Sequence, residues 1–291
     1  MEFWFVLTVG SALLVGVASF GRKVIAERGY DVPLISAYSG VISASLLLLI
    51  AIQQDTSYEL SSFLFLILSV GALLYLVANI TTNRALQAID STIYFPIYKI
   101  VGPLLVIVAG IILFSESFSD NEWLGLGLSL LVPVLLITSS EKIRQNNLWL
   151  GLWLLLLTTL MTATAAIISK EVADTASDLW FALAVGDGLL AVSAAFLFIF
   201  HNRKQNIFTQ IKQHSSTGFI LWAVIIGVIQ AIAFAMLLFA YRDGSLGIIY
   251  TVHSLYILIP IVLSIIYYHE HWNVRKVLAI ILSIAALWFL Q

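Results

Sequence analysis

Residues 147–169 read NLWLGLWLLLLTTLMTATAAIIS, a run of 23 residues without a charged side chain. A helix that crosses a bilayer needs about 20 apolar residues. Within this run, residues 150–157 are apolar on every side, whereas a membrane barrel strand alternates polar and apolar positions over about 10 residues. The segment therefore predicts a transmembrane helix and argues against a barrel.

Nine further apolar stretches of similar length lie on both sides of this one, separated by short polar breaks. The ten predicted spans are residues 3–20, 32–52, 62–80, 92–113, 122–139, 147–169, 178–200, 217–241, 246–268 and 273–290. A hydrophobic fraction of 61% and a charged fraction of 10% fit no soluble domain of this size. The connections leave no room for a soluble catalytic domain, so the function must lie among the helices.

The composition excludes several other classes of site. A net charge of −2 gives no basic face for nucleic acid, so we expect no nucleic-acid partner. Without cysteine there are no disulfides or thiolate metal sites. No metal-ligand spacing, nucleophile triad or phosphate loop occurs, so we expect no metal, no cofactor and no catalytic residues.

The apolar pattern repeats, with five spans before about residue 145 and five after it. Charged residues match between the halves at offsets of 147 and 154, and they carry more weight than matched leucines because charges are scarce. The charged matches are Lys23 with Lys170, Asp31 with Asp178, and Glu116 with Glu270. We therefore expect one membrane domain built from two five-helix repeats, residues 1–140 and 147–291.

An odd number of spans in each half requires the halves to lie upside down relative to each other. The loops after spans 1, 3, 5, 7 and 9 together carry 11 Lys and Arg residues, and Arg22, Lys23 and Arg28 are assigned to the first of them. The loops on the other side of the membrane carry only two. Inverted repeats of this kind are typical of secondary transporters, with the substrate site between the repeats near the bilayer midplane. Because basic loops face the cytoplasm, the charge count places both termini outside.

The stretch from Ile111 to Leu131, IILFSESFSDNEWLGLGLSLL, ends one span, places Glu116 in a short loop and opens the next span with Trp123 and Gly125. The second copy keeps Glu270 but has Ala279 in place of the glycine. With ten spans in a 5+5 arrangement over the whole chain, the sequence resembles the drug/metabolite transporter superfamily, EamA type. That resemblance implies transport of small metabolites, amino acids, nucleotide sugars or drugs. It also implies cytoplasmic termini, against the charge count.

Two ionisable residues lie at the same depth of repeat-related spans. Lys99 is about seven residues into the fourth span, and His253 matches it in the ninth. Such groups usually face a bundle interior or a wet cavity, and an unperturbed histidine titrates near pH ~6.5, which would allow a pH dependence. Two interpretations are open: both residues line one cavity, or Lys99 pairs with a buried acid, for which Asp187 is the natural partner.

Amphipathic side chains near these two positions suit an organic substrate, although tyrosine is also common at membrane interfaces and in packing. Deep amides either bind substrate or join helices. The candidate substrate-binding residues are Lys99, His253, Tyr94, Tyr98, Tyr250, Tyr256, Asn79 and Gln230. Pro96, Pro103 and Pro260 interrupt backbone bonding in the same two spans.

The other charged residues are predicted to be structural. Glu116 and Glu270 lie in hairpin loops, Ser119 and Glu122 form a capping box, and Lys23 and Lys170 extend to the interface from span ends. Gly125 and Gly127 provide space for close packing.

The sequence therefore predicts an all-α integral membrane protein with ten transmembrane helices in an inverted 5+5 repeat. Its expected function is secondary transport of a small organic solute by alternating access in a cell membrane, with the lipid bilayer, the solute and protons as partners. A membrane-embedded lipid-modifying enzyme and a non-transporting membrane subunit are the alternatives.

Overall fold

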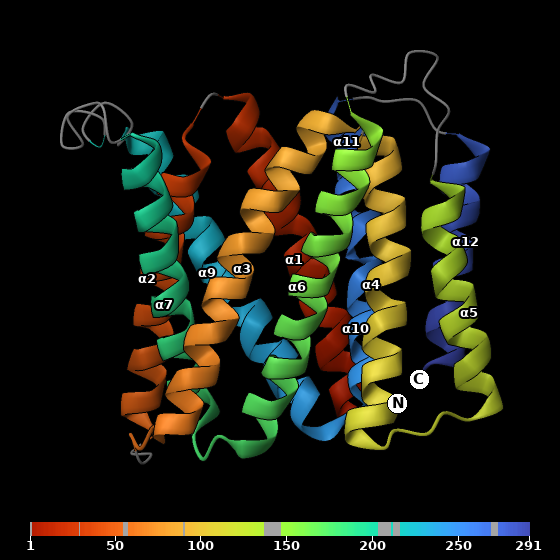
Figure 1. Ribbon diagram of the computed structural model, residues 1–291, viewed down its shortest axis with the longest axis horizontal. Coiled ribbons are helices and arrows are strands. Elements are labelled where there is room, and N and C mark those ends of the chain that lie inside the picture. Colours follow the sequence, from red (N-terminus) through yellow and green to blue (C-terminus); the bar gives the residue numbers. More distant parts are fainter. Residues whose placement is uncertain are drawn as a thin grey trace.

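The computed structural model describes residues 2–28, 30–54, 58–89, 91–136, 147–202, 211, 216–268 and 273–291. All regular structure in these ranges is helical, and the helices form one bundle (Figure 1). Their bounds are α1 (Phe3–Glu27), α2 (Val32–Gln53), α3 (Ser62–Ala88), α4 (Ser91–Phe114), α5 (Asp120–Leu135), α6 (Leu148–Thr175), α7 (Leu179–His201), α9 (Thr217–Asp243), α10 (Leu246–Ser254), the 3-10 helix η1 (Leu255–Ile257), α11 (Leu258–Tyr268) and α12 (Val274–Phe289).

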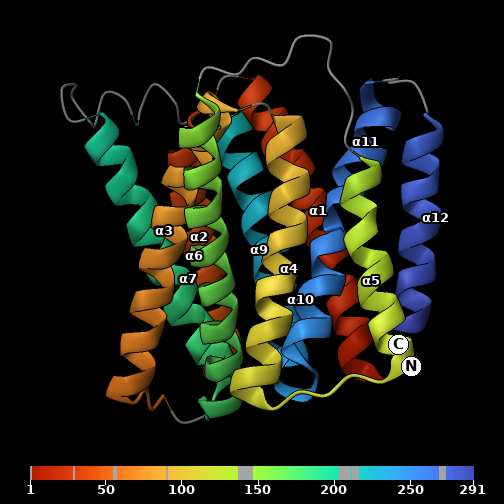
Figure 2. The same cartoon turned by 45° about the vertical axis from the view of Figure 1, so that its right-hand side comes forward.

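In the described part of the chain ten helical segments cross the bundle, with α10, η1 and α11 forming one of them. Eight segments are long and apolar enough to span a membrane by length and composition. The other two, α5 and α12, have 16 residues each, or about 24 Å at ~1.5 Å per residue. They pack against each other and form the right-hand side of the bundle in the view of Figure 2. The expected ten-helix membrane fold is confirmed.

The two halves run in opposite directions. Both termini lie at one end of the bundle, where α1 begins, whereas α6 begins at the other end (Figure 1). The helix contacts have the same two-fold character. Three helices of the first half contact their own repeat partners, namely α2 with α7, α4 with α10, and α5 with α12. The contact of α1 with α9 is matched by the contact of their repeat partners, α6 with α3. The inverted repeat expected from the sequence is therefore present in the packing.

Matched polar residues perform matched structural tasks in the two halves. Asp31 accepts a hydrogen bond from Leu34 N at the start of α2, and Asp178 accepts one from Trp180 N at the start of α7, both at 2.8 Å. These carboxylates satisfy amides that a helix start leaves without a partner. The serines that match in sequence are also equivalent, since Ser129 and Ser283 each donate to the carbonyl three residues earlier at 2.7 Å.

Charged residues also join helix ends across the bundle. Glu116, in the loop after α4, accepts from the amides of Leu246 and Gly247, the first residues of α10. Lys170 of α6 donates to Asp174 and to the carbonyl of Tyr241 near the end of α9, at 2.6 Å for the carbonyl. A helix start favours a negative charge, as with Glu116 at α10, and a helix end favours a positive charge, as with Lys170 at α9. The capping box of Ser119 and Glu122 is confirmed.

The ninth span contains a short 3-10 turn, whereas its repeat partner is α-helical throughout. Proline has no N–H, so Pro260 cannot donate to the carbonyl of Tyr256, and the chain forms the short η1 helix between α10 and α11. Helix α4 contains Pro96 and Pro103 yet remains one helix.

Helix packing depends on small residues. Gly125 of α5 lies so close to α12 that an added Cβ would be 2.6 Å from Leu290 Cγ, whereas a Cβ on Gly127 would meet nothing within 4 Å. Of these two predicted glycines, only Gly125 is at a close helix contact. Large apolar side chains point outward instead, as at Ile112, Trp149 and Trp288, which are more than 70% exposed. Such a surface fits contact with lipid.

Three sequence predictions need adjustment or lie outside the described residues. Helix α5 ends at Leu135 and not at 139. Arg22 lies inside α1, which extends to Glu27, so it does not belong to the first basic loop. Glu270 and the side chain of Lys23 fall outside what the structure describes.

Candidate functional site

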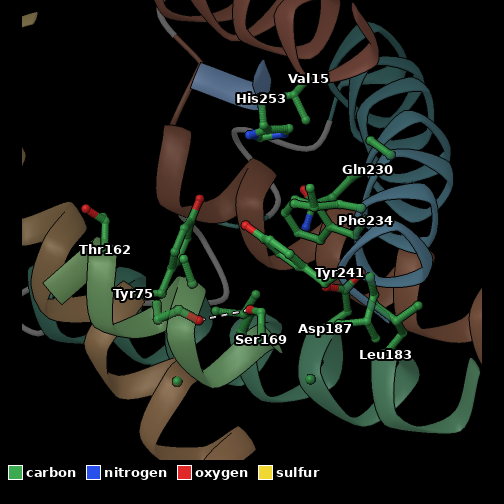
Figure 3. A pocket seen from close by; sticks show the side chains of 18 of the residues that line it. Val15, Tyr75, Thr162, Ser169, Leu183, Asp187, Gln230, Phe234, Tyr241 and His253 are labelled. Atoms are coloured by element: carbon green, nitrogen blue, oxygen red, sulfur yellow. Dashed lines mark hydrogen bonds between the residues drawn. The ribbon is translucent and has the colours of Figure 1, made fainter. Parts of the chain in front are cut away.

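A cavity of about 350 Å³ lies between the two halves of the bundle. Its walls come from α1, α3 and α4 of the first half and from α6, α7, α9, α10 and η1 of the second. Figure 3 shows labelled side chains from six of these elements converging on this space, among them Val15, Thr162, Asp187, Gln230 and His253. Its volume is at the lower end of the range of about 300–1,000 Å³ for small-molecule sites.

Lys99 is the buried cation of this cavity. It projects from α4, and only 7% of the residue is exposed. Its ammonium lies 3.9 Å from the ring centre of Tyr256 and 5.3 Å from that of Tyr98. The negative faces of these rings attract a cation. Among the described residues no carboxylate forms an ion pair with Lys99 within 4.0 Å, so the rings are the contacts that the structure gives to its charge.

Asp187 lines the same cavity but has a different partner from the one suggested by the sequence. It is 2% exposed and accepts a hydrogen bond from the hydroxyl of Ser43 on α2. The structure therefore does not contain the Lys99–Asp187 pair that was one of the two interpretations of Lys99. It corresponds to the other, in which the lysine faces a shared cavity.

His253 lines the cavity from α10, next to the 3-10 helix η1. Its ring lies 5.6 Å from that of Tyr256 in an edge-on arrangement. The Nε2 atom is buried and has no hydrogen-bond partner among the described residues. A buried polar atom without a partner is costly, and a ligand in the cavity would be able to supply one.

A second cation reaches the cavity from α1. Arg22 donates from Nη2 to the side-chain oxygen of Gln230 on α9 at 3.2 Å, and both residues line the space. The sequence prediction missed Arg22 because it ended the first span at residue 20. A signal was present in the repeat, since the 147-residue offset relates Arg22 to Ser169, and both line the cavity.

Six of the eight predicted binding residues line the cavity. They are Lys99, His253, Tyr98, Tyr250, Tyr256 and Gln230. The other two lie elsewhere. Tyr94 is 1% exposed and its hydroxyl bonds with Thr82 at 3.0 Å, and Asn79 is exposed and donates to the carbonyl of Tyr75 at 2.9 Å.

The cavity is not symmetric about the two-fold relation. It includes Ala182, three residues from the start of α7, and Tyr241, two residues from the end of α9. Both helix ends lie at the end of the bundle that holds the termini (Figure 1). No residue of α2, the repeat partner of α7, lines the cavity. The cavity thus reaches from Lys99 toward one end of the bundle.

Comparisons with known proteins address the fold and the family. Residues 149–291 match the model of the EamA-like transporter family. A solved structure described only as "Crystal structure of protein" is similar over 98% of this chain and 95% of its own, with a TM-score of 0.77 and 13% identity. At that identity the likeness concerns the fold alone. No curated protein matches the sequence.

Proposed function

The chain belongs to the EamA-like transporter family of the drug/metabolite transporter superfamily, and on that premise we propose that it is a secondary transporter of a small organic solute. The solute is a molecule of the size of an amino acid, a metabolite or a drug. It crosses by alternating access at the interface of the two repeats, residues 1–140 and 147–291. The proposal places the chain as a multi-pass protein in the cell membrane and includes no catalytic step.

One observation carries the proposal: a cavity between the inverted halves contains a buried cation, Lys99, that no described carboxylate neutralises. Ionisable side chains inside a membrane are expensive and mark substrate or ion pathways. A purely structural interior would gain stability by replacing this lysine with an apolar residue. Its presence in a cavity is therefore best explained by a ligand.

The one-sided extent of the cavity supports alternating access. Two halves related by an inverted two-fold can each take the conformation of the other. Here α7 lines the cavity and its repeat partner α2 does not, which we assign to one of the two resulting states. In the other state α2 would line the cavity in place of α7, and the cavity would extend toward the opposite end of the bundle.

We propose that substrate contacts come from the cavity residues alone. The cation and rings at Lys99, Tyr98 and Tyr256 would hold one end of the solute. His253, Tyr250 and Gln230 would supply further polar contacts. Tyr94 and Asn79 have no place in the proposed site because they lie outside the cavity.

Protons are the coupling ion that we propose to test first. His253 is the one described histidine in the cavity wall, and its buried Nε2 lacks a partner. If it carries the coupled proton, an imposed pH gradient will drive uptake by the native chain, and the His253→Gln variant will transport without that dependence. Equal pH dependence in both proteins would remove His253 from the coupling step.

Solute flux tests the proposed function. The full chain is reconstituted into liposomes, and entry of a panel of radiolabelled organic acids, amino acids and amines is followed against protein-free liposomes. Saturable uptake of at least one solute, with exchange against the same unlabelled solute inside, is the expected result. Binding without any flux would favour a non-transporting subunit, and chemical conversion of a lipid or solute would favour an enzyme.

A further inference from the structure

The charges of the cavity wall are unequal. Two cationic side chains, Lys99 and Arg22, line it, whereas Asp187 is the single described acid that does so. The carboxylate of Asp187 is bonded to Ser43, and it forms no ion pair with either cation within 4.0 Å. The described wall therefore carries an excess of positive charge in a largely buried space.

The two cations have donors left for a ligand. An ammonium has three N–H donors and a guanidinium has five. Arg22 uses one of its donors in the hydrogen bond to Gln230. Lys99 makes ring contacts to Tyr256 and Tyr98, which engage its charge, and its ammonium has three donors to share between Tyr256 and a ligand. Anionic oxygen atoms are the partners that these donors bind most strongly.

The rest of the wall is apolar or aromatic. Phe234, Leu237 and Leu190 line the space together with the rings of Tyr98, Tyr250 and Tyr256. Apolar walls with a few polar groups that fix orientation are typical of sites for organic molecules. A small inorganic ion would leave this surface without a partner.

We propose that the substrate is an organic anion, whose carboxylate or phosphate pairs with Lys99 and Arg22 and whose apolar or aromatic body lies against the tyrosine rings. This inference rests on the proposed transport function, because it names the substrate class of the same cavity. The excess of cations in the described wall makes a cationic drug the least favoured occupant. A neutral solute would leave Lys99 without a counter-charge.

The test compares small compounds that share a phenyl ring and carry an anionic, neutral or cationic head group, with inorganic phosphate as the ion without a ring. The purified full chain in detergent is melted with phenylacetate, phenylacetamide or phenethylammonium, and with phenyl phosphate or inorganic phosphate. We expect stabilisation by phenylacetate or phenyl phosphate and none by the amide or the amine. The stronger of the two acids tells a carboxylate ligand from a phosphate ester, and inorganic phosphate shows whether the organic body is required.

Variants link the effect to the cavity. Loss of one buried charge-assisted contact weakens binding by about tenfold to a hundredfold, so Lys99→Met should show that loss for the acids. Lys99→Arg should keep part of the affinity because it keeps the charge. Lys276→Met removes a lysine of α12 that does not line the cavity, and it should bind as the native chain does.

The outcomes separate this inference from the proposed function. Stabilisation by the amide or amine, no stabilisation by any compound, or unchanged acid binding in Lys99→Met would overturn the anion assignment. Acid binding that depends on Lys99 without flux into liposomes would keep the anion site and reject transport. Flux of the amine or the amide, with no flux of the acids, would keep transport and reject the anion.

Discussion

Replacing Lys99 with methionine should make the ligand-free protein more stable. The ammonium sits on a residue that is 7% exposed, without a described carboxylate in reach. Methionine has a similar length, adapts to irregular space and carries no charge. The substitution therefore removes an uncompensated buried charge and keeps most of the packing.

The magnitude follows from two opposing contributions. A lysine near the centre of a membrane helix costs about 2.5–3.5 kcal/mol. The ring of Tyr256, 3.9 Å from the ammonium, returns roughly 1–2 kcal/mol. The difference leaves a gain of about 0.5–2.5 kcal/mol for the variant, which corresponds to a rise in Tm of roughly 1–10 °C for a large domain.

The assay is thermal melting of the purified, ligand-free chain, with Lys276→Met as the matched lysine control and solute flux measured on the same preparations. We expect a higher Tm and no flux for Lys99→Met, and native flux for the control, whose lysine does not line the cavity. A lower Tm of similar size would mean that a partner holds Lys99 and that its charge supports the fold. In that case the reasoning from an uncompensated cation is wrong.

Three further predictions concern the framework and the orientation. Glu116→Gln weakens the carboxylate contacts to the first amides of α10, so it should lower stability by about 1–2 kcal/mol, measured as a fall in Tm. Gly125→Ala should destabilise by about 1–3 kcal/mol because its Cβ would meet α12. The matched Gly127→Ala should be neutral or stabilising, and equal Tm losses would contradict the packing argument. The chain has no native cysteine, so Gln291→Cys should label with an impermeant reagent in intact cells, and labelling only after lysis would show cytoplasmic termini.

The fold was accessible from the sequence because its signals are long and redundant. Apolar runs fix the spans, and scarce charges such as Asp31 and Asp178 align the halves. The ends of helices were less accessible, since α1 and α3 continue well past the last predicted residue of their spans. The parts of these helices beyond the predicted spans carry polar residues such as Arg22 and Arg84, and polarity alone does not tell a helix end from a loop.

The sequence predicts a cavity residue well where its position along a span is the deciding factor. It predicts poorly where the direction of the side chain around the helix axis decides whether it faces the cavity. Lys99 and His253 lie equally far from the first residues of their spans, well inside apolar sequence, and both line the cavity. Tyr94 is five residues before Lys99, about 140° away around a helix of ~3.6 residues per turn, so it packs against a different neighbour. Asp187 was the natural partner by composition, but the hydroxyl of Ser43 lies beside it. Hydroxyl positions in apolar helices carry too little pattern to predict such a pairing.

The central claim is that the cavity opens to each side of the membrane in turn, and sided labelling of a cavity cysteine tests it most directly. Ser19 lines the cavity on α1, and Ser177 is exposed in the connection between α6 and α7. In vesicles of known orientation, Ser19→Cys should react with an impermeant reagent from either side, and a transported solute should change the two rates in opposite directions. Ser177→Cys should react from one side only. Reaction of Ser19→Cys from a single side, unchanged by every transported solute, would contradict alternating access through this cavity.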